Sequence, residues 1–383
     1  MNSMSSNKSS NLSGEIIVPG DKSISHRALI IGSMVTGKLK IKNLLESEDV
    51  IATADALKTL GVKINKNKNI WEVSGNGVGN LYGSNFSLDL GNSGTGSRLL
   101  MGLIAGSEVE ATILGDNSLS KRPMKRIITP LLKTGAIFDD PNNDKLPIKI
   151  KGTKIPLPIE YLSPVASAQI KSSILLAGLS STGNTTVIEP TLSRDHTERM
   201  LKYLGAKIST TQLPNSFWKI TLEGLPLLKP LDIEIPSDPS SAAFPLVAGL
   251  ISQDAEITIS NVGLNPLRIG LIETLREMGA TIDVNNEREQ AGEPVADLLV
   301  RSSKLNGVTV PPERAPSMID EYPILAVAAA TAEGVTLMQG LAELRVKESD
   351  RLAAIVDGLR ACGVIVDVEG DDLIVTGSPG QLA

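Results

Sequence analysis

A helix-end motif recurs five times along the 383-residue chain. Each copy has a leucine four residues before a glycine and a β-favouring residue three residues after it. The leucine lies one helical turn back on the apolar face, the glycine takes the left-handed conformation that ends a helix, and apolar residues beyond it begin a strand. The copies are LKTLGVKI (Leu57–Ile64), LLKTGAIF (Leu131–Phe138), LKYLGAKI (Leu201–Ile208), LREMGATI (Leu275–Ile282) and LRACGVIV (Leu359–Val366).

The spacing of these motifs indicates a duplicated structural unit rather than a coincidental helix ending. The motif glycines (Gly61, Gly135, Gly205, Gly279 and Gly363) are 74, 70, 74 and 84 residues apart. Units of this length exceed the common solenoid repeats, so we expect them to cluster into globular lobes. The first copy predicts the order β-α-β-α-β-β, with elements at Glu15–Val18, Ser23–Val35, Leu39–Leu44, Glu48–Leu60, Val62–Ile64 and Ile70–Val73.

Composition narrows the class of protein further. Apolar residues make up 41% of the chain and aromatic residues only 3%, so the cores must consist mainly of aliphatic side chains. This favours an α/β protein with helices packed on sheets. A net charge of −6 argues against a nucleic-acid binder with a broad basic surface. No run approaches the length of a membrane span, the leader has no hydrophobic signal region, and the single cysteine, Cys362, excludes an intramolecular disulfide. We therefore expect a cytoplasmic protein, with no nucleic-acid or membrane partner.

Three loops in the first half of the chain combine glycines, hydroxyls and cations. The segment P-G-D-K-S-I-S-H-R at Pro19–Arg27 follows a strand and opens a helix, where free N–H groups and basic side chains suit a phosphate or carboxylate. It lacks the P-loop pattern, which disfavours a kinase. The glycines of L-G-N-S-G-T-G-S-R at Leu90–Arg98 allow close approach of a ligand. Arg122 stands in S-K-R-P-M-K-R at Ser120–Arg126, a run whose charges would repel unless solvated or sharing an anion.

Three further loops supply uncharged hydrogen-bonding groups, carboxylates and cations. Ser167 and Gln169, in S-P-V-A-S-A-Q-I-K-S-S, can orient hydroxyls and phosphate oxygens. Asp320 precedes a strongly apolar helix and is either a helix cap or a candidate base. In R-V-K-E-S-D-R, the spacing of Lys347 and Arg351 predicts two cations on one helical face with Glu348 beside them, and a solvated helix bearing ion pairs would look similar. The two histidines lie in no ligand-spaced cluster, so we expect no metal site.

Taken together, the loops resemble the 5-enolpyruvylshikimate-3-phosphate synthases, the enolpyruvyl transferases of the shikimate pathway. The resemblance runs from about Leu12 to the end of the chain. Six segments carry it in the family's order: G-D-K-S-I-S-H-R (Gly20–Arg27), G-N-S-G-T-G-S-R (Gly91–Arg98), K-R-P-M (Lys121–Met124), S-A-Q-I-K-S (Ser167–Ser172), D-E-Y-P (Asp320–Pro323) and R-V-K-E-S-D-R-L (Arg345–Leu352).

The resemblance implies a two-lobed, inside-out α/β barrel fold in which each lobe contains three β-α-β-α-β-β units and the lobes close on the ligands. The first strand belongs with the C-terminal half. One lobe would therefore comprise residues 1–20 and 237–383, and the other residues 21–236 with three units. Five of the six expected units are present, and the family's last unit, with its D-H-R motif, has no counterpart before Ala383. We therefore expect a C-terminally truncated member and a lobe incomplete at that end.

The resemblance also implies a reaction and its residues. The enolpyruvyl group of phosphoenolpyruvate moves onto the 5-hydroxyl of shikimate 3-phosphate by addition and elimination, on the route to chorismate and the aromatic amino acids. No cofactor, metal or covalent enzyme intermediate is implied, and we expect a monomer. Asp320 would accept the hydroxyl proton, and Glu348 and Lys22 would manage protons at the methylene carbon. Shikimate 3-phosphate contacts would be Lys22, Ser23, Arg27, Ser167, Gln169, Asp320 and Lys347; phosphoenolpyruvate contacts would be Lys22, Gly94, Arg122, Gln169 and Arg351.

Two alternatives remain at this point. The sister transferase that acts on a UDP-sugar shares the architecture but uses a loop cysteine, whereas Cys362 aligns with helix-end positions and is expected in the core. The other alternative is a catalytically impaired remnant that binds shikimate 3-phosphate without turning it over.

Overall fold

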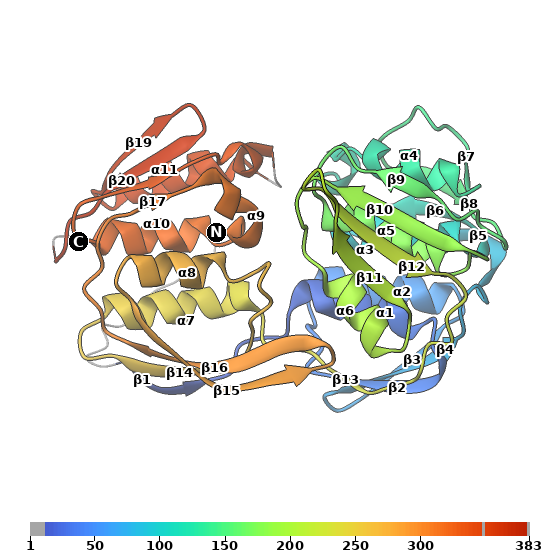
Figure 1. Cartoon of the computed structure of the whole chain (residues 1–383), viewed down its shortest axis with the longest axis horizontal. Coiled ribbons are helices and arrows are strands. Elements are labelled where there is room, and N and C mark those ends of the chain that lie inside the picture. The colour runs from blue at the N-terminus through green and yellow to red at the C-terminus, as the bar shows by residue number, and fades with distance from the viewer. Residues whose placement is uncertain (1–11, 347–348, 381–383) are drawn as a thin grey trace. The chain divides into compact units, whose positions relative to one another are not determined.

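The structure of the chain is a computed structural model that describes residues 12–346 and 349–380. It divides into two compact units. Unit 1 contains the described residues up to Pro19, Ser237–Arg288, and those from Pro294 onward, whereas unit 2 contains Gly20–Pro236 and Glu289–Glu293. The chain therefore passes between the units at four points, and the tip of one hairpin is assigned to the other unit (Figure 1).

The described residues form five four-stranded sheets, which are the outer layers of the two units. Unit 1 has two sheets, with strand orders β1 (Ser13–Ile16), β14 (Glu256–Gly263), β16 (Glu293–Arg301), β15 (Thr281–Gln290), and β17 (Thr309–Val310), β18 (Val335–Met338), β20 (Asp372–Thr376), β19 (Ile365–Glu369). Unit 2 has three, with orders β13 (Ile233–Glu234), β2 (Thr36–Lys42), β4 (Ile70–Asn76), β3 (Lys63–Asn67); β5 (Tyr82–Asp89), β6 (Glu108–Leu114), β8 (Ile148–Lys151), β7 (Ile137–Phe138); and β9 (Glu160–Leu162), β10 (Asn184–Glu189), β12 (Trp218–Glu223), β11 (Ile208–Gln212).

All five sheets share one pairing scheme. The first strand in each order is parallel to the second, and the third is antiparallel to the second. A parallel pair requires a crossover connection, and a helix supplies it between β5 and β6, between β9 and β10, and between β17 and β18. The remaining two sheets exchange their first strands, because β1 pairs with β14 and β13 pairs with β2.

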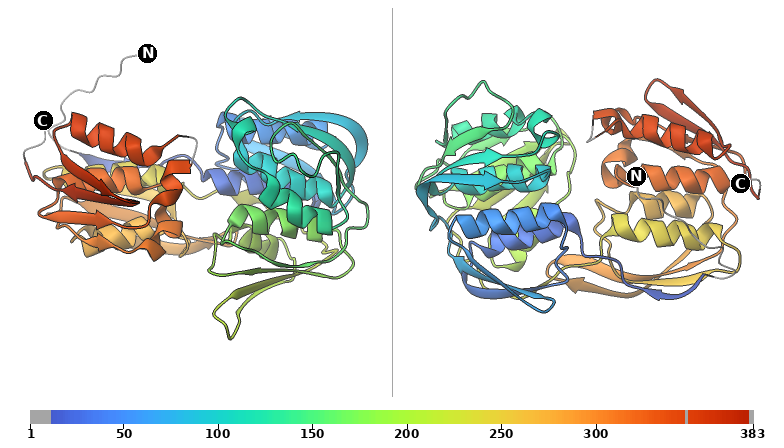
Figure 2. Two further views of the ribbon diagram at one scale, coloured as in Figure 1. Left: turned by 90° about the horizontal axis from the view of Figure 1, so that it is seen from above. Right: turned by 180° about the vertical axis from the view of Figure 1, so that it is seen from behind.

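Each of the five sequence repeats contributes one buried helix and one amphipathic helix. The buried helices are α1 (Lys22–Gly32), α3 (Gly94–Ala105), α5 (Ala168–Gly178), α7 (Pro239–Ile251) and α10 (Tyr322–Thr331). The amphipathic helices are α2 (Glu48–Thr59), α4 (Lys125–Lys133), α6 (His196–Tyr203), α8 (Gly270–Glu277) and α11 (Arg351–Ala361), and a short α9 (Ala315–Met318) precedes α10. In both compact units the buried helices lie inside the sheets, as the views in Figure 2 also show, so the α/β class and the inside-out arrangement are confirmed.

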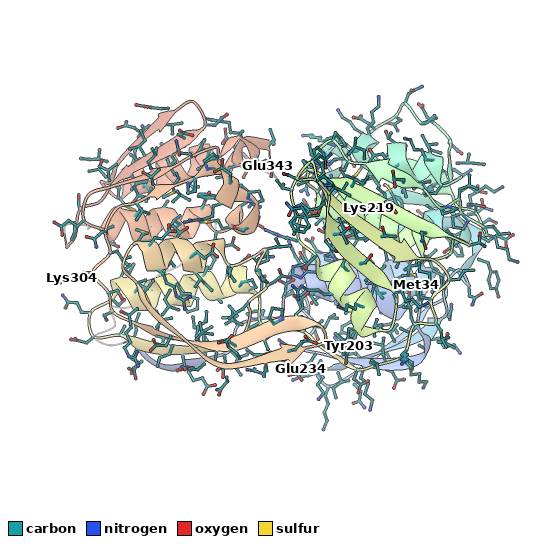
Figure 3. All side chains as sticks on the ribbon, in the orientation of Figure 1. Met34, Tyr203, Lys219, Glu234, Lys304 and Glu343 are labelled. Carbon is teal, nitrogen blue, oxygen red and sulfur yellow. The ribbon has the colours of Figure 1, made fainter. Side chains whose placement is uncertain are left out.

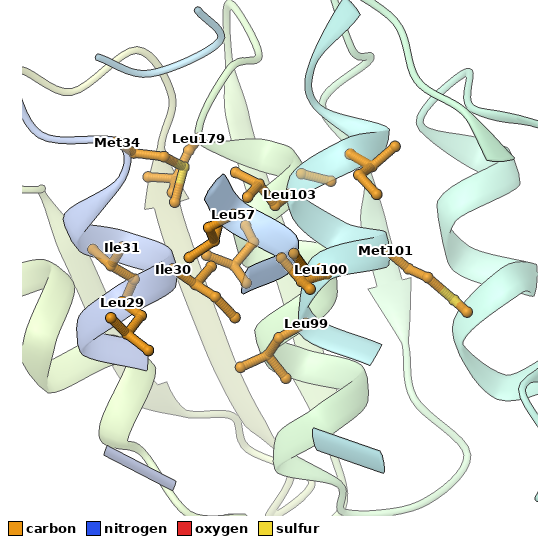
Figure 4. Packing of buried hydrophobic residues seen from close by; sticks show 14 of the residues in the cluster. Leu29, Ile30, Ile31, Met34, Leu57, Leu99, Leu100, Met101, Leu103 and Leu179 are labelled. Atoms are coloured by element: carbon orange, nitrogen blue, oxygen red, sulfur yellow. The ribbon is translucent and has the colours of Figure 1, made fainter. Parts of the chain in front are cut away.

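The core of unit 2 is aliphatic. Leu29, Ile30 and Ile31 of α1 pack near Leu99 and Leu100 of α3 (Figure 4), and all five are fully buried. Nearly every residue of α1, α3 and α5 is buried, so these helices are stable only where other elements enclose them. The outward sheet faces carry polar side chains, such as Lys219 on β12 (Figure 3), whose ammonium lies 3.3 Å from the Glu160 carboxylate.

The helix-end motif is confirmed at all five positions. The motif glycines have positive φ, from 78° to 101°. The motif leucines are buried, fully so at Leu57, Leu131, Leu201 and Leu275. At four copies the residue after the glycine donates its N–H to the carbonyl of the motif leucine, as Val62 does to Leu57 at 3.0 Å. This bond closes a Schellman motif and turns the chain into the following strand.

Several predicted boundaries are wrong by a few residues, as β2 and β4 are, and the first strand and first helix show why. The first strand is β1 at Ser13–Ile16, not 15–18, because its pairing with β14 stops at Ile259, where that strand is interrupted by a bulge. The first helix ends at Gly32 rather than at Val35. There the carbonyls of Ser33 and Val35 accept hydrogen bonds from the amides of Asn76, the last residue of β4, and Gly77, which ends the helical pattern.

Candidate active site

The first turns of three buried helices in unit 2 carry several of the predicted site residues. Lys22 and Ser23 open α1, Gly94 opens α3, and Ser167 is the N-cap of α5. Each helix has a side-chain cap on one N–H: the Asp21 carboxylate accepts from the amide of Ile24 at 2.8 Å, and Ser93 and Ser167 act similarly. The remaining N–H groups of a first turn favour anionic ligands.

Arg27 lies one turn beyond Ser23 and is almost completely buried, with 3% of its surface exposed. Its Nη1 donates to the Ser23 carbonyl at 2.9 Å, its Nε to Thr197 Oγ1 at 2.7 Å, and its Nη2 to Ser172 Oγ at 3.0 Å. The guanidinium therefore joins α1 to α5 and α6. This orientation supports the expectation that Arg27 and Ser23 act on the same ligand.

Lys22 has a weak and replaceable partner. Its ammonium lies 3.4 Å from the Asp49 carboxylate at the start of α2, and half of the lysine side chain is exposed. Ion pairs of this kind contribute little to stability, so an incoming anion can compete for the ammonium. The sequence did not single out Asp49, and an acidic residue in the first turn of a helix gives no signal beyond ordinary helix preference.

Gln169 is held by two groups from α3. Its carbonyl oxygen accepts from Arg98 Nη1 at 3.2 Å, and its amide nitrogen donates to Thr95 Oγ1 at 3.2 Å. Arg98 is buried and also donates to the backbone carbonyls of Gly94 and Pro123. From the sequence alone, no role was assigned to Arg98. The signal that could have singled it out is its spacing, four residues from Gly94 on one helical face.

Gly94 and Arg122 form the adjacent part of the candidate site. A Cβ added to Gly94 would lie 3.0 Å from Nη1 of Arg122 and 3.0 Å from Nη1 of Arg98. Arg122 is half-buried and donates to Asn92 and, at 3.3 Å, to Ser118. Printed contacts aside, the hydrogen bonds in unit 2 thus link Ser23 with Arg27, and Arg98 with Gln169 beside Gly94 and Arg122. Lys22 and Ser167 stand at the starts of α1 and α5.

Unit 1 supplies a second group of predicted residues. Asp320 precedes α10, and its carboxylate accepts from Arg351 Nη1 at 3.1 Å. The interpretation of Asp320 as a helix cap is wrong, because Glu321 occupies the N-cap position of α10. Both charged groups of the Asp320–Arg351 pair are about one third exposed and therefore accessible to a ligand.

Buried neighbours fix the backbone next to Asp320. Glu321 is 2% exposed and lies 3.4 Å from Nη2 of Arg268, which also donates to Ser240 Oγ at 2.7 Å. Ser240 in turn donates to the Glu321 carboxylate. These contacts attach the start of α10 to the start of α7.

The last predicted loop is only partly described. Lys347 and Glu348 lie outside the described residues. Arg351 is the first residue of α11, with Asp350 as its N-cap accepting from the Ala353 amide at 2.9 Å. The expectation that one helical face carries both Lys347 and Arg351 therefore falls outside what the structure describes, and only the helix start at Arg351 is established.

The described part of the chain contains neither a candidate metal site nor a candidate membrane span. Residues 12–346 and 349–380 contain no group of three or more histidine, cysteine, aspartate and glutamate side chains that could hold a metal ion. No helix among them is long and apolar enough to cross a membrane.

Comparison with known proteins identifies the family. Residues 6–383 match the family described as EPSP synthase (3-phosphoshikimate 1-carboxyvinyltransferase). The chain belongs to the EPSP synthase family. It is 55% identical to the 3-phosphoshikimate 1-carboxyvinyltransferase of Rhodospirillum rubrum, covering 97% of this chain and 83% of that protein. The corresponding protein of Parvibaculum lavamentivorans is 54% identical, covering 99% and 84% of the two chains. A solved EPSP synthase from Acinetobacter baumannii is 42% identical, with a TM-score of 0.87 over 96% of this chain and 82% of that one.

Cys362, on which the UDP-sugar alternative depends, does not lie where the sequence analysis expected. Cys362 is exposed. The equivalent positions in the other four sequence repeats are all buried: Leu60, Thr134, Leu204 and Met278. Its neighbours Ala361 and Gly363 are exposed as well, so no described side chain covers this end of α11. The cysteine follows the C-terminal end of α11, whereas the candidate site residue Arg351 stands at the other end.

Proposed function

We propose that this chain transfers the enolpyruvyl group of phosphoenolpyruvate to the 5-hydroxyl of shikimate 3-phosphate, releasing phosphate. One observation carries the proposal: the first two turns of α1, α3 and α5 present guanidinium groups, a hydroxyl and an oriented amide that are joined by direct contacts between the helices. Preorganised groups of this kind bind two anionic substrates and offset the repulsion between them. Membership of the family supplies the identity of the two anions.

The proposed contacts divide between the two substrates. The carboxylate, hydroxyls and phosphate of shikimate 3-phosphate need donors and one acceptor, and the residues assigned to them are Lys22, Ser23, Arg27, Ser167, Gln169, Asp320 and Lys347. The phosphate and carboxylate of phosphoenolpyruvate need cations and a backbone that can be approached closely, and the residues assigned to them are Lys22, Gly94, Arg122, Gln169 and Arg351. The space beside Gly94 and the guanidinium nitrogens 3.0 Å from it support its assignment.

The proposed chemistry has two steps. In the addition, the 5-hydroxyl oxygen attacks C2 of phosphoenolpyruvate while Asp320 takes the hydroxyl proton and an acid, Glu348 or Lys22, protonates the methylene carbon C3. In the elimination, C3 loses a proton to the same group, the C2–C3 double bond re-forms, and the C2–O bond to phosphate breaks. General acid–base groups of this kind each contribute roughly 10²- to 10⁴-fold to the rate.

The Asp320–Arg351 pair supports the role given to Asp320. The Arg351 guanidinium orients the Asp320 carboxylate, the group that the proposal makes the base. When the anion of phosphoenolpyruvate takes the guanidinium as its partner, the carboxylate becomes able to accept the hydroxyl proton. We also infer a cytoplasmic monomer acting only on small molecules, supported by the acidic net charge and the single cysteine.

Phosphate release tests the proposal. The purified chain should release phosphate from phosphoenolpyruvate only when shikimate 3-phosphate is present, and Asp320→Asn should reduce kcat by about 10²-fold or more. Asp367→Asn, at an exposed position on β19, is the matched control and should leave kcat unchanged. Absence of turnover with shikimate 3-phosphate still bound would contradict the proposal and favour the impaired remnant.

A further inference from the structure

Two adjacent polar contacts join α5 to α6 in unit 2. Lys171 Nζ lies 2.8 Å from Glu198 Oε1, and Ser172 Oγ lies 2.7 Å from Thr197 Oγ1. The partners are consecutive residues on both helices, so the contacts follow one another along the interface. We refer to them as the ion-pair contact (Lys171–Glu198) and the hydroxyl contact (Ser172–Thr197). Neither is among the groups assigned above to a substrate.

The ion-pair contact is buried and well satisfied at its cationic end. Lys171 has no exposed surface, and its ammonium also contacts Glu189 Oε1 at 2.9 Å and the Ser193 carbonyl at 3.0 Å. Burial lowers the pKa of Lys171, but the charges of Glu198 and Glu189 outweigh it and the pKa is raised. The lysine is therefore charged throughout the physiological range. Breaking a buried ion pair is strongly destabilising, so the contact holds α5 and α6 together.

The hydroxyl contact is the part that touches Arg27. Thr197 Oγ1 accepts from Nε at 2.7 Å, and Ser172 Oγ accepts from Nη2 at 3.0 Å. The Ser23 carbonyl accepts from Nη1 at 2.9 Å. A guanidinium has five N–H donors in a rigid plane. Within the described residues these three bonds use one N–H on each nitrogen, and one N–H on each of Nη1 and Nη2 remains for an anion.

Glu198 also acts on Arg27 through its charge. Burial lowers the pKa of Arg27, and the Glu198 carboxylate opposes that effect more than any other charged group does. The same carboxylate therefore holds Lys171 and compensates the buried guanidinium. If α6 moved away from α5, Lys171 would lose an ion-pair partner and Arg27 would lose the compensating charge of Glu198.

We propose that Thr197 and Glu198 are positioning residues that fix the guanidinium plane of Arg27 through the adjacent hydroxyl and ion-pair contacts between α5 and α6. This inference rests on the proposed function, which assigns Arg27 to shikimate 3-phosphate. A guanidinium held in one plane offers its remaining two N–H groups to the planar carboxylate of that substrate at little entropic cost.

A double-mutant cycle with Arg27 tests the inference. Thr197→Val removes the hydroxyl and keeps the shape, and Thr197→Ser keeps the hydroxyl. Thr197→Val should raise the KM for shikimate 3-phosphate about tenfold, with kcat and the KM for phosphoenolpyruvate changed by less than about twofold. Thr197→Ser should stay within about twofold of the original chain. In the Arg27→Ala background, Thr197→Val should have almost no further effect, because the group it positions is gone.

Glu198→Gln measures the ionic part of the proposal in the same cycle. It should also raise the KM for shikimate 3-phosphate, and this effect too should vanish in the Arg27→Ala background. The inference would be overturned if either substitution raised the KM for shikimate 3-phosphate by the same factor with and without Arg27. It would also be overturned if the KM values for both substrates rose equally, because ordinary structural residues would act in this way. If Arg27→Ala itself leaves the KM for shikimate 3-phosphate unchanged, the substrate assignment of Arg27 in the proposed function fails instead. Thermal unfolding followed by Trp71 and Trp218, both in unit 2, identifies any variant that does not fold.

Discussion

At the scale of single residues, Gly94 gives the sharpest steric prediction. Gly94→Ala would place a methyl group 3.0 Å from the guanidinium tips of Arg98 and Arg122. The tips must shift by a few tenths of an ångström, which crowds the space proposed for phosphoenolpyruvate. A bulkier mimic of that substrate, such as glyphosate, should suffer more than the substrate itself. We expect the inhibitory concentration of glyphosate to rise by about tenfold or more, with a smaller increase in the KM for phosphoenolpyruvate.

Gly358→Ala is the matched control for that experiment. Gly358 lies within α11, and a Cβ added there meets no atom within 4 Å. This variant should leave inhibition unchanged and stabilise the protein by about 1 kcal/mol, since alanine is the better helix former. Equal inhibition of the Gly94→Ala variant and the original chain would refute the steric argument.

Residue types at the site could be predicted from the sequence, but their partners could not. The motifs singled out Lys22, Arg27 and Asp320 because cations and carboxylates beside helix starts carry chemistry. That Arg27 bonds to Thr197 depends on a contact across 170 residues, and no local pattern records it. The pairing of Asp320 with Arg351 is equally non-local, which is why the sequence could not choose between a cap and a base there.

At the scale of elements, a buried histidine joins α1 to α2. His26 Nδ1 lies 2.9 Å from Thr53 Oγ1, and the ring is completely buried. Burial, followed by the nearby charges of Lys22 and Arg27, lowers the pKa of His26 from 6.5 to about 3. The folded protein therefore keeps the ring neutral where the unfolded chain binds a proton.

This difference predicts an acid-sensitive contact between the two helices. Stability from His26 is complete above pH 6.5 and is lost as the pH falls from 6.5 towards about 3. The loss is about 1.4 kcal/mol per pH unit in that window, or about 2 kcal/mol at pH 5. His26→Asn cannot take up this proton, so its free energy of unfolding should fall less steeply between pH 7 and pH 5. Urea unfolding monitored by tryptophan fluorescence measures both slopes, and parallel slopes would rule the coupling out.

The order of elements could be predicted because the repeat contains its own evidence. The helix-end motif, a buried leucine followed four residues later by a left-handed glycine, depends only on local sequence. All five copies were located correctly. Strand ends depended instead on distant partners, as at the bulge in β14 that ends β1. For the same reason the exposure of Cys362 escaped prediction, since burial depends on what packs over a position rather than on its place in a motif.

At the scale of the whole molecule, the path of the chain between units could not be predicted from the repeat. β1 and β13 exchange sheets, and residues 289–293 at the tip of the β15–β16 hairpin belong to unit 2. The β-strand pattern of the hairpin is continuous in sequence, and no residue in it indicates that the tip belongs to unit 2. The contact that explains it is buried: Glu293 Oε1 lies 2.8 Å from His196 Nδ1, 97 residues away.

That contact gives a prediction for the molecule as a whole. Glu293→Ala removes the buried partner of His196 and a carboxylate oxygen 4.0 Å from Arg199 Nε. Because a buried polar group left without its partner costs about 1–3 kcal/mol, the free energy of unfolding of unit 2 should fall by that amount. Both tryptophans lie in unit 2, so urea unfolding followed by their fluorescence isolates the effect. Glu287→Gln, exposed on the same hairpin, should leave the transition in place. An unchanged transition for Glu293→Ala would mean that unit 2 does not depend on the hairpin tip for its stability.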